Sequence, residues 1–232
     1  MTKPTTEIAR LYLRPGSNMP DPGSEASVIW KESVTTLSTM EGFQASLFSV
    51  DSKDSDIFLQ FLDWDSLAAH EAVMNSPAYG PFLERVGVIM ARFPDLNHVQ
   101  FSVYGKDGIE QSVAPCTALK NTYTVVEKFY FPASIDTAAV EAARASLVRG
   151  ASQLPAFKVA ACGWLMEEVE HPAVGGPGRV QLLAIGFDNA QSAESFRLSQ
   201  DRRETLRDVG AKADESWVAH FLEPVPPSKG KA

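Results

Sequence analysis

Residues 59–66 read LQFLDWDS, and residues 182–189 read LLAIGFDN. Each stretch is an apolar run that ends in an aromatic residue, Trp64 or Phe187. Each then reaches a polar residue suited to begin a helix, Ser66 or Asn189. The pairing predicts that one strand-to-helix unit occurs twice in the chain.

The elements around the two stretches follow the same order, strand–helix–strand–strand–helix–strand. In the first half, apolar alternation and helical spacing predict strands over residues 7–13, 43–50, 57–63 and 98–104, and helices over 24–37, 66–76 and 81–93. In the second half, they predict strands over residues 122–131, 157–167, 179–187 and 216–222, and helices over 135–151 and 190–209. The sequence therefore predicts a tandem duplication.

A βαββαβ unit packs both helices on one face of its sheet and leaves the other face partly apolar. A second, covalently attached sheet can bury that face. We therefore predict an α+β fold in which two ferredoxin-like units are fused into a single-chain dimeric α/β barrel. The expected boundaries are residues 1–104 for the first half, 105–121 for a linker, 122–223 for the second half and 224–232 for a disordered tail.

Composition limits the partners of the chain. Its 232 residues carry a formal net charge of −8, which disfavours nucleic acid and anionic membrane surfaces. No apolar run approaches the roughly 20 residues that span a bilayer, and the first residues lack the apolar core of a signal peptide. Cys116 and Cys162 fit no metal spacing and no disulfide framework. We expect a cytoplasmic protein.

The stretch FLDWDSLAAHEA at residues 61–72, followed by NSPAY at 75–79, resembles the antibiotic-biosynthesis monooxygenase-like branch of the dimeric α/β-barrel superfamily. The resemblance implies a pocket between sheet and helices in each half. Family activities include cofactor-free oxygenation of phenolic polyketides, polyketide cyclisation, haem degradation and lactone isomerisation. A shared scaffold does not choose among them.

Three residues of the first half match positions that the resemblance assigns to the pocket. Trp64 matches a tryptophan at the pocket floor, and Gln60 stands where quinone-forming members have an amide. His70 stands where those members have a tyrosine. His70 is either a general base, since a histidine titrates near neutral pH, or a polar residue on a half-exposed helix face. Trp64 either stacks on a substrate or packs in the core.

Further candidates come from the second helical region and the fourth strand. The resemblance places Tyr79 at a catalytic position of a polyketide-cyclising member and Arg85 near a substrate-binding arginine. The haem-ligating position holds Leu83, which disfavours haem. His98 either faces the barrel interior, where it would contact a substrate, or lies at an exposed edge.

The leading prediction is a small-molecule enzyme that uses no metal or organic cofactor and acts on a hydrophobic, aromatic or polyketide-like molecule. His70 would remove a proton while Tyr79 and Gln60 hold the oxygen, with oxygenation, cyclisation or elimination following. The alternatives are a non-catalytic ligand-binding or stress-associated protein, and a structural duplicate without cavities. We expect one working pocket, in residues 1–104, within a monomeric pseudo-dimer or a homodimer.

Overall fold

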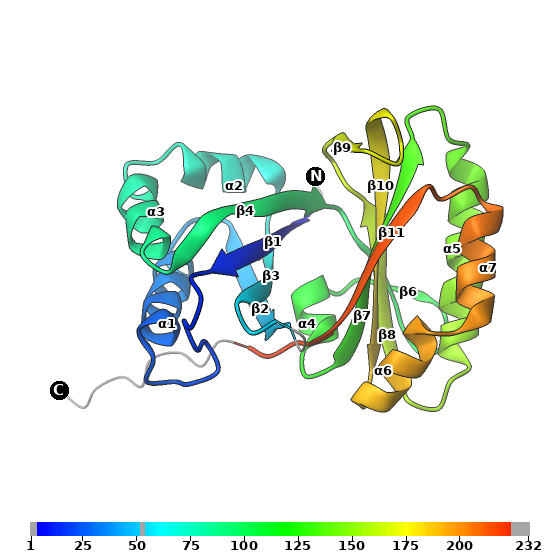
Figure 1. Cartoon of the computed structure of the whole chain (residues 1–232), viewed down its shortest axis with the longest axis horizontal. Helices are drawn as coiled ribbons and strands as arrows, with labels where there is room; N and C mark the ends of the chain where they lie inside the picture. The colour runs from blue at the N-terminus through cyan, green and yellow to red at the C-terminus, as the bar shows by residue number, and fades with distance from the viewer. Residues whose placement is uncertain (1–3, 52–53, 224–232) are drawn as a thin grey trace. The chain divides into compact units, whose positions relative to one another are not determined.

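The computed structural model describes residues 4–51 and 54–223, and the chain divides into two compact units (Figure 1). Unit 1 comprises residues Met1–Leu96 together with Leu222–Ala232, and unit 2 comprises Asn97–Phe221. The predicted disordered tail, residues 224–232, lies outside the described residues. No helix in the described part of the chain has the length and apolar character needed to cross a membrane.

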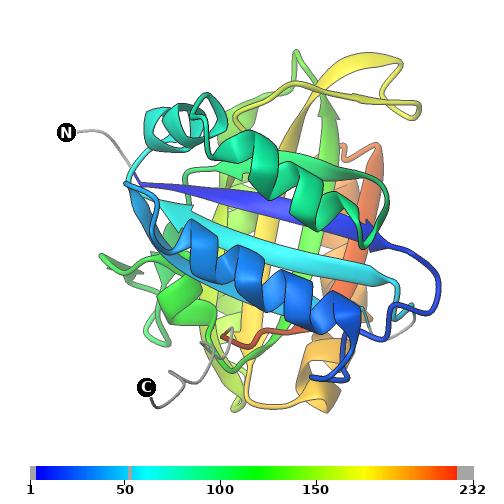
Figure 2. The same ribbon diagram turned by 90° about the vertical axis from the view of Figure 1, so that its left-hand side faces the viewer.

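Unit 1 has the predicted strand–helix order. Its elements are β1 (Thr5–Leu13), α1 (Glu25–Leu37), β2 (Phe43–Val50), β3 (Ile57–Trp64), α2 (Leu67–Met74), α3 (Tyr79–Gly87) and β4 (Met90–Val99). The sheet order is β2-β3-β1-β4, and the three helices lie on one face of the sheet (Figure 2). The Ser66 side chain accepts a hydrogen bond from the Ala69 backbone N–H, which confirms Ser66 as the cap of α2.

The end of α3 differs from the prediction. A helix was expected over residues 81–93, but α3 ends at Gly87, and Met90–Val99 forms β4. The apolar spacing of Val86, Ile89 and Met90 correctly indicated burial, since all three pack on the core of unit 1. Ile89 and Met90, however, reach that core from the turn and the following strand. Pro94 is accommodated because β4 is an edge strand.

Unit 2 repeats the topology. Its elements are β5 (Ser102–Tyr104), β6 (Glu110–Gln111), α4 (Pro115–Leu119), β7 (Tyr123–Pro132), α5 (Thr137–Ser152), β8 (Phe157–Trp164), β9 (Val169–His171), β10 (Gly176–Phe187), α6 (Ala190–Arg197), α7 (Gln200–Asp208) and β11 (Ala213–His220). Its sheet path, β11-β7-β10-β8-β5-β6, contains the order of unit 1 and adds β5 and β6, and β9 pairs with β10 off this path. The predicted fold of two fused ferredoxin-like units is confirmed.

The boundary between the units differs from the expected break at residue 104. His98 accepts a hydrogen bond from the Met166 backbone N–H, and Val99 bridges Leu165, so the end of β4 belongs to unit 2. The expected linker is also structured, because it supplies β6 and α4. At the other end, Leu222 exchanges two backbone hydrogen bonds with Phe48 on β2, which returns the chain to unit 1.

Candidate functional site

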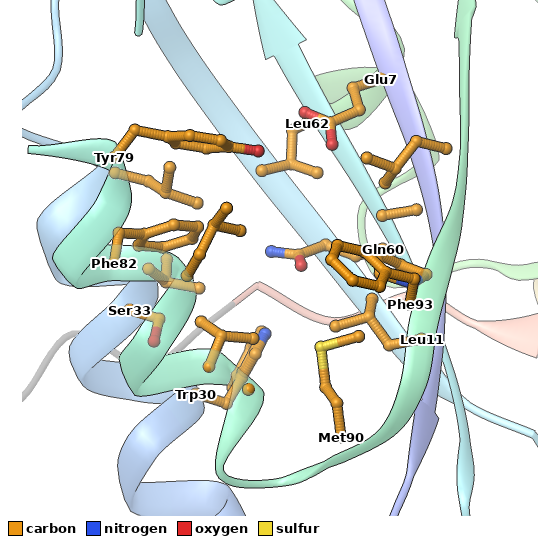
Figure 3. A pocket seen from close by; sticks show the side chains of 18 of the residues that line it. Glu7, Leu11, Trp30, Ser33, Gln60, Leu62, Tyr79, Phe82, Met90 and Phe93 are labelled. Carbon is orange, nitrogen blue, oxygen red and sulfur yellow. The ribbon is translucent and has the colours of Figure 1, made fainter. Parts of the chain in front are cut away.

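A cavity of about 340 Å³ lies inside unit 1, between the sheet and the helices (Figure 3). Its walls come from alternate residues of β1 and β3, from α1, α2 and α3, and from the first half of β4. Most of the lining is apolar, as in ligand pockets generally. The polar side chains on its wall include Glu7, Ser33, Gln60, His70 and Tyr79.

Glu7, on β1, is at the centre of the polar part of the wall. Its Oε2 atom lies 3.2 Å from His70 Nε2 and accepts a hydrogen bond from Trp64 Nε1 at 3.3 Å. The carboxylate is 7% exposed. An indole N–H and an imidazole nitrogen therefore lie against a buried carboxylate, and hydrogen bonds from such groups compensate for the loss of water around its charge.

His70 is buried, and the interpretation as a half-exposed helix residue is wrong, since only 3% of its surface is exposed. It lies on α2, where its ring stacks on Trp64 with centroids 4.8 Å apart and planes 25° apart. Trp64 itself is fully buried and also contacts Phe43 edge to face. Trp64, which also contacts Phe43, therefore helps to fix the position of the His70 imidazole against Glu7.

Tyr79 is the first residue of α3, and its hydroxyl points into the cavity (Figure 3). Burial, and secondly the negative charge of Glu7, raise the pKa of the Tyr79 phenol above its ordinary value of 10.0. The phenol therefore keeps its proton at neutral pH. Tyr79 can donate a hydrogen bond to an oxygen placed in the cavity.

Two buried nitrogen atoms on the cavity wall have no hydrogen-bond partner among the described residues. One is Nε2 of Gln60, a residue 6% exposed, and the other is Nε1 of Trp30, a residue 4% exposed. Buried N–H groups are nearly always paired, because leaving one unpaired costs about 1–3 kcal/mol. Such a donor on a cavity wall is available to hydrogen-bond a molecule bound in the cavity.

The β1–β3 register orders the polar groups along the cavity. Glu7 lies opposite Leu62, Ala9 opposite Gln60, and Leu11 opposite Phe58. Trp30 contacts Phe58, with ring centroids 5.1 Å apart. The Glu7–His70 pair thus stands at one end, Gln60 in the middle and Trp30 toward the other end.

The other two predicted substrate-binding residues, Arg85 and His98, are not among the residues that line the cavity. Arg85 bonds Glu32 of α1 through Nη2 at 2.6 Å, with both side chains about half exposed. His98 belongs to unit 2, where its Nδ1 lies 2.6 Å from Glu167 Oε1. Roles for either in substrate binding stay predictions. Gln60, Trp64, His70 and Tyr79 all line one cavity.

Sequence reasoning missed Glu7 and Trp30. Glu7 was interpreted only as the first residue of a strand, EIARLYL, yet its alternation with Ala9 and Leu11 places a carboxylate on the apolar face of that strand. An acidic residue in that register is a signal of a buried charge. Trp30 was passed over within a helix, and nothing in its spacing distinguishes it from a core residue.

The chain is similar to several solved structures over nearly its whole length. An anthrone oxidase-like protein matches with 18% identity and a TM-score of 0.68, covering 95% of this chain and 92% of the other. A proposed monooxygenase from Fusobacterium nucleatum matches with 12% identity and a TM-score of 0.63, covering 96% and 94%. A proposed monooxygenase from Lactobacillus acidophilus matches with 11% identity and a TM-score of 0.55, covering 96% and 97%.

No protein-family model and no curated protein matches the chain. At identities below 20%, the structural likeness establishes the fold. It extends over both units, so the resemblance predicted from residues 61–79 is confirmed at the level of the fold. The chain therefore shares the fused, duplicated ferredoxin-like fold of the anthrone oxidase-like protein and of the two proposed monooxygenases.

Proposed function

We propose that unit 1 binds a small, largely apolar aromatic molecule and that the Glu7–His70 pair removes a proton from it. The observation that carries the proposal is the buried carboxylate on the cavity wall, held 3.2 Å from an imidazole that is itself 97% buried. Histidine and glutamate are common general bases in enzymes.

The neighbouring donors suit the charge that deprotonation creates. When a proton leaves a carbon beside a ketone, or leaves a phenol, negative charge gathers on the oxygen. The Tyr79 hydroxyl and the Gln60 Nε2 group both face the cavity and can donate to that oxygen (Figure 3). Fixed donors in a site that excludes water stabilise such an anion strongly.

The likeness to an anthrone oxidase-like protein supports dioxygen as the second reactant. A deprotonated methylene carbon can pass electrons to dioxygen and form a carbon–oxygen bond. Loss of water then leaves a ketone, so that one CH₂ group and one O₂ give one C=O group and one H₂O. The substrate carbanion supplies the electrons, so this reaction requires no cofactor. Cyclisation and elimination would begin with the same deprotonation.

Anthrone tests the proposal in two stages. Under nitrogen in deuterated buffer, the purified protein should speed hydrogen exchange at the anthrone methylene, followed by NMR. In air, it should speed formation of anthraquinone, followed by absorbance. Glu7→Gln and His70→Asn should each lower both rates by about 100-fold or more, the usual contribution of a general base.

Matched substitutions outside the cavity serve as controls. Glu32→Gln changes an exposed carboxylate on α1, and His171→Asn changes a histidine of unit 2; both should keep the wild-type rates. Normal exchange in Glu7→Gln and His70→Asn would sink the assignment of the base. If the wild-type protein binds anthrone but leaves exchange at the buffer rate, unit 1 is a ligand-binding module, the alternative class of function.

A further inference from the structure

The proposed reaction engages Glu7, His70, Tyr79 and Gln60, and it leaves Trp30 unexplained. Trp30 lies on α1, packed between Phe48 and Phe58 at centroid distances of 4.2 and 5.1 Å. Packing accounts for its ring. It does not account for the indole N–H, which is buried on the cavity wall and has no partner among the described residues.

The register gives the distances that matter. Glu7 and Leu11 are four residues apart on β1, which corresponds to about 13 Å of extended strand. Gln60 lies opposite Ala9, about 7 Å along the strand from Glu7. Trp30 reaches the Leu11 end through its contact with Phe58. The two orphaned donors are therefore spaced along the cavity, beyond the carboxylate that would take the proton.

The rest of the cavity wall indicates which ligand groups the two nitrogens can bind. The cavity wall also includes Leu11, Val34 and Leu37, whose side chains cannot accept a hydrogen bond. The Ser33 hydroxyl is also on the wall and donates to the Ile29 carbonyl at 2.7 Å, but neither orphaned nitrogen is bonded to it. A ligand without oxygens would fill the space and leave both N–H groups unpaired and dry.

We infer that Trp30 determines specificity: its Nε1–H donates to an acceptor oxygen of the ligand at the end of the cavity away from Glu7, while Gln60 Nε2 donates to a second oxygen nearer the middle. The inference rests on the proposed function only in assuming that the cavity of unit 1 holds the substrate. It selects neutral ring systems with oxygens at two spaced positions. Hydrocarbons of the same shape are rejected.

Two probes of matched shape test this inference without any reaction. 1,4-Dimethoxynaphthalene carries two acceptor oxygens, and 1,4-diethylnaphthalene has methylene groups in their place; neither has an acidic hydrogen. Their dissociation constants follow from the change in naphthalene fluorescence on binding. The wild-type protein should bind the diether about 10-fold more tightly than the hydrocarbon, at roughly 3-fold per hydrogen bond.

Trp30→Phe keeps the ring packing and removes the N–H, so it should reduce the 10-fold preference to about 3-fold, and Gln60→Leu should do the same. Trp164→Phe is the matched control, because it removes an indole N–H that bonds Glu141 in unit 2. The preference is a ratio within one variant, which cancels losses of folded protein. An unchanged ratio in Trp30→Phe, equal binding of both probes, or no binding of either would overturn the inference. A normal ratio without anthrone turnover would overturn only the proposed reaction.

Discussion

Three positions that are polar in unit 1 are apolar at the corresponding positions of unit 2. The strand pairs of the two units can be aligned from their first pairs, Thr5 with Trp64 and Tyr123 with Phe187. In this alignment Glu7 corresponds to Val125, and Gln60 corresponds to Leu183. Counting from the helix caps Ser66 and Asn189 matches His70 with Ala193. Every polar group at these three cavity positions of unit 1 has an apolar counterpart in unit 2.

The buried core of unit 2 also contains several aromatic side chains. Its buried cluster includes five phenylalanines, Phe129, Phe131, Phe157, Phe187 and Phe196. Ala9 of unit 1 has a charged counterpart, Glu127, which is fully buried and pairs with Arg202 of α7 at 2.5 Å. One unit thus keeps polar groups facing a cavity, and the other pairs its charges internally. Duplication permits this difference, because only one copy has to retain a site.

The buried ion pair of unit 2 offers the strongest test. Arg202→Met leaves the Glu127 carboxylate without its cation at zero exposure, so the free energy of unfolding should fall by about 3–5 kcal/mol in urea denaturation. Adding Glu127→Leu should recover most of the loss, since an apolar pair replaces the charges. Arg85→Met, which breaks the exposed pair of unit 1, should cost less than about 1 kcal/mol. Equal losses of unfolding free energy in Arg202→Met and Arg85→Met would contradict the stated difference between a buried ion pair in unit 2 and an exposed one in unit 1.

Exchanging one residue between the units should change stability with opposite signs. Gln60→Leu removes the unpaired buried Nε2 group from unit 1 and should raise the free energy of unfolding by about 1–3 kcal/mol. Leu183→Gln places a side-chain amide in the filled core of unit 2 and should lower it by at least that amount. Urea denaturation of both variants decides the point. Destabilisation by both would mean that Gln60 has partners in the native protein.

The smallest effect concerns the Tyr79 phenol. Its pKa is raised by burial and then by Glu7, so Tyr79 should ionise above pH 10, as seen in the 295 nm absorbance lost in Tyr79→Phe. Glu7→Gln should bring the midpoint closer to 10, because the second cause is gone. A raised pKa means stability that is present below pH 10 and lost as the pH rises through the folded-state value. A midpoint at or below 10 would contradict the burial of the phenol.

Much of this architecture was predictable because it depends on patterns that repeat. Period-two alternation, helical spacing and the cap Ser66 located most strands and helices of both units. The pattern failed at residues 88–93, where apolar spacing continued smoothly from helix into strand. A single sequence does not distinguish the two when both face one core, and Pro94 was taken as a helix end rather than as an edge-strand residue.

The candidate site was predictable only in part. Gln60, Trp64, His70 and Tyr79 lie within 20 residues of one another, so one motif located them together. Glu7 meets His70 and Trp64 only through the pairing of β1 with β3, which joins residues 57 positions apart. Arg85 lies on α3 and forms an ion pair with Glu32 of α1, a partner far away in the sequence. Such tertiary pairings are not encoded in local spacing.

The two backbone hydrogen bonds between Leu222 and Phe48 bear on how the chain folds during synthesis. Unit 2 is an uninterrupted segment, Asn97–Phe221, placed between two parts of unit 1. On the ribosome, all of unit 2 emerges before Leu222 can reach β2, a strand at the edge of its sheet. Until then the β2 edge has backbone groups open to another chain, a known route to aggregation. Slower synthesis of residues 97–221 is therefore expected to lengthen the time for which the β2 edge is exposed.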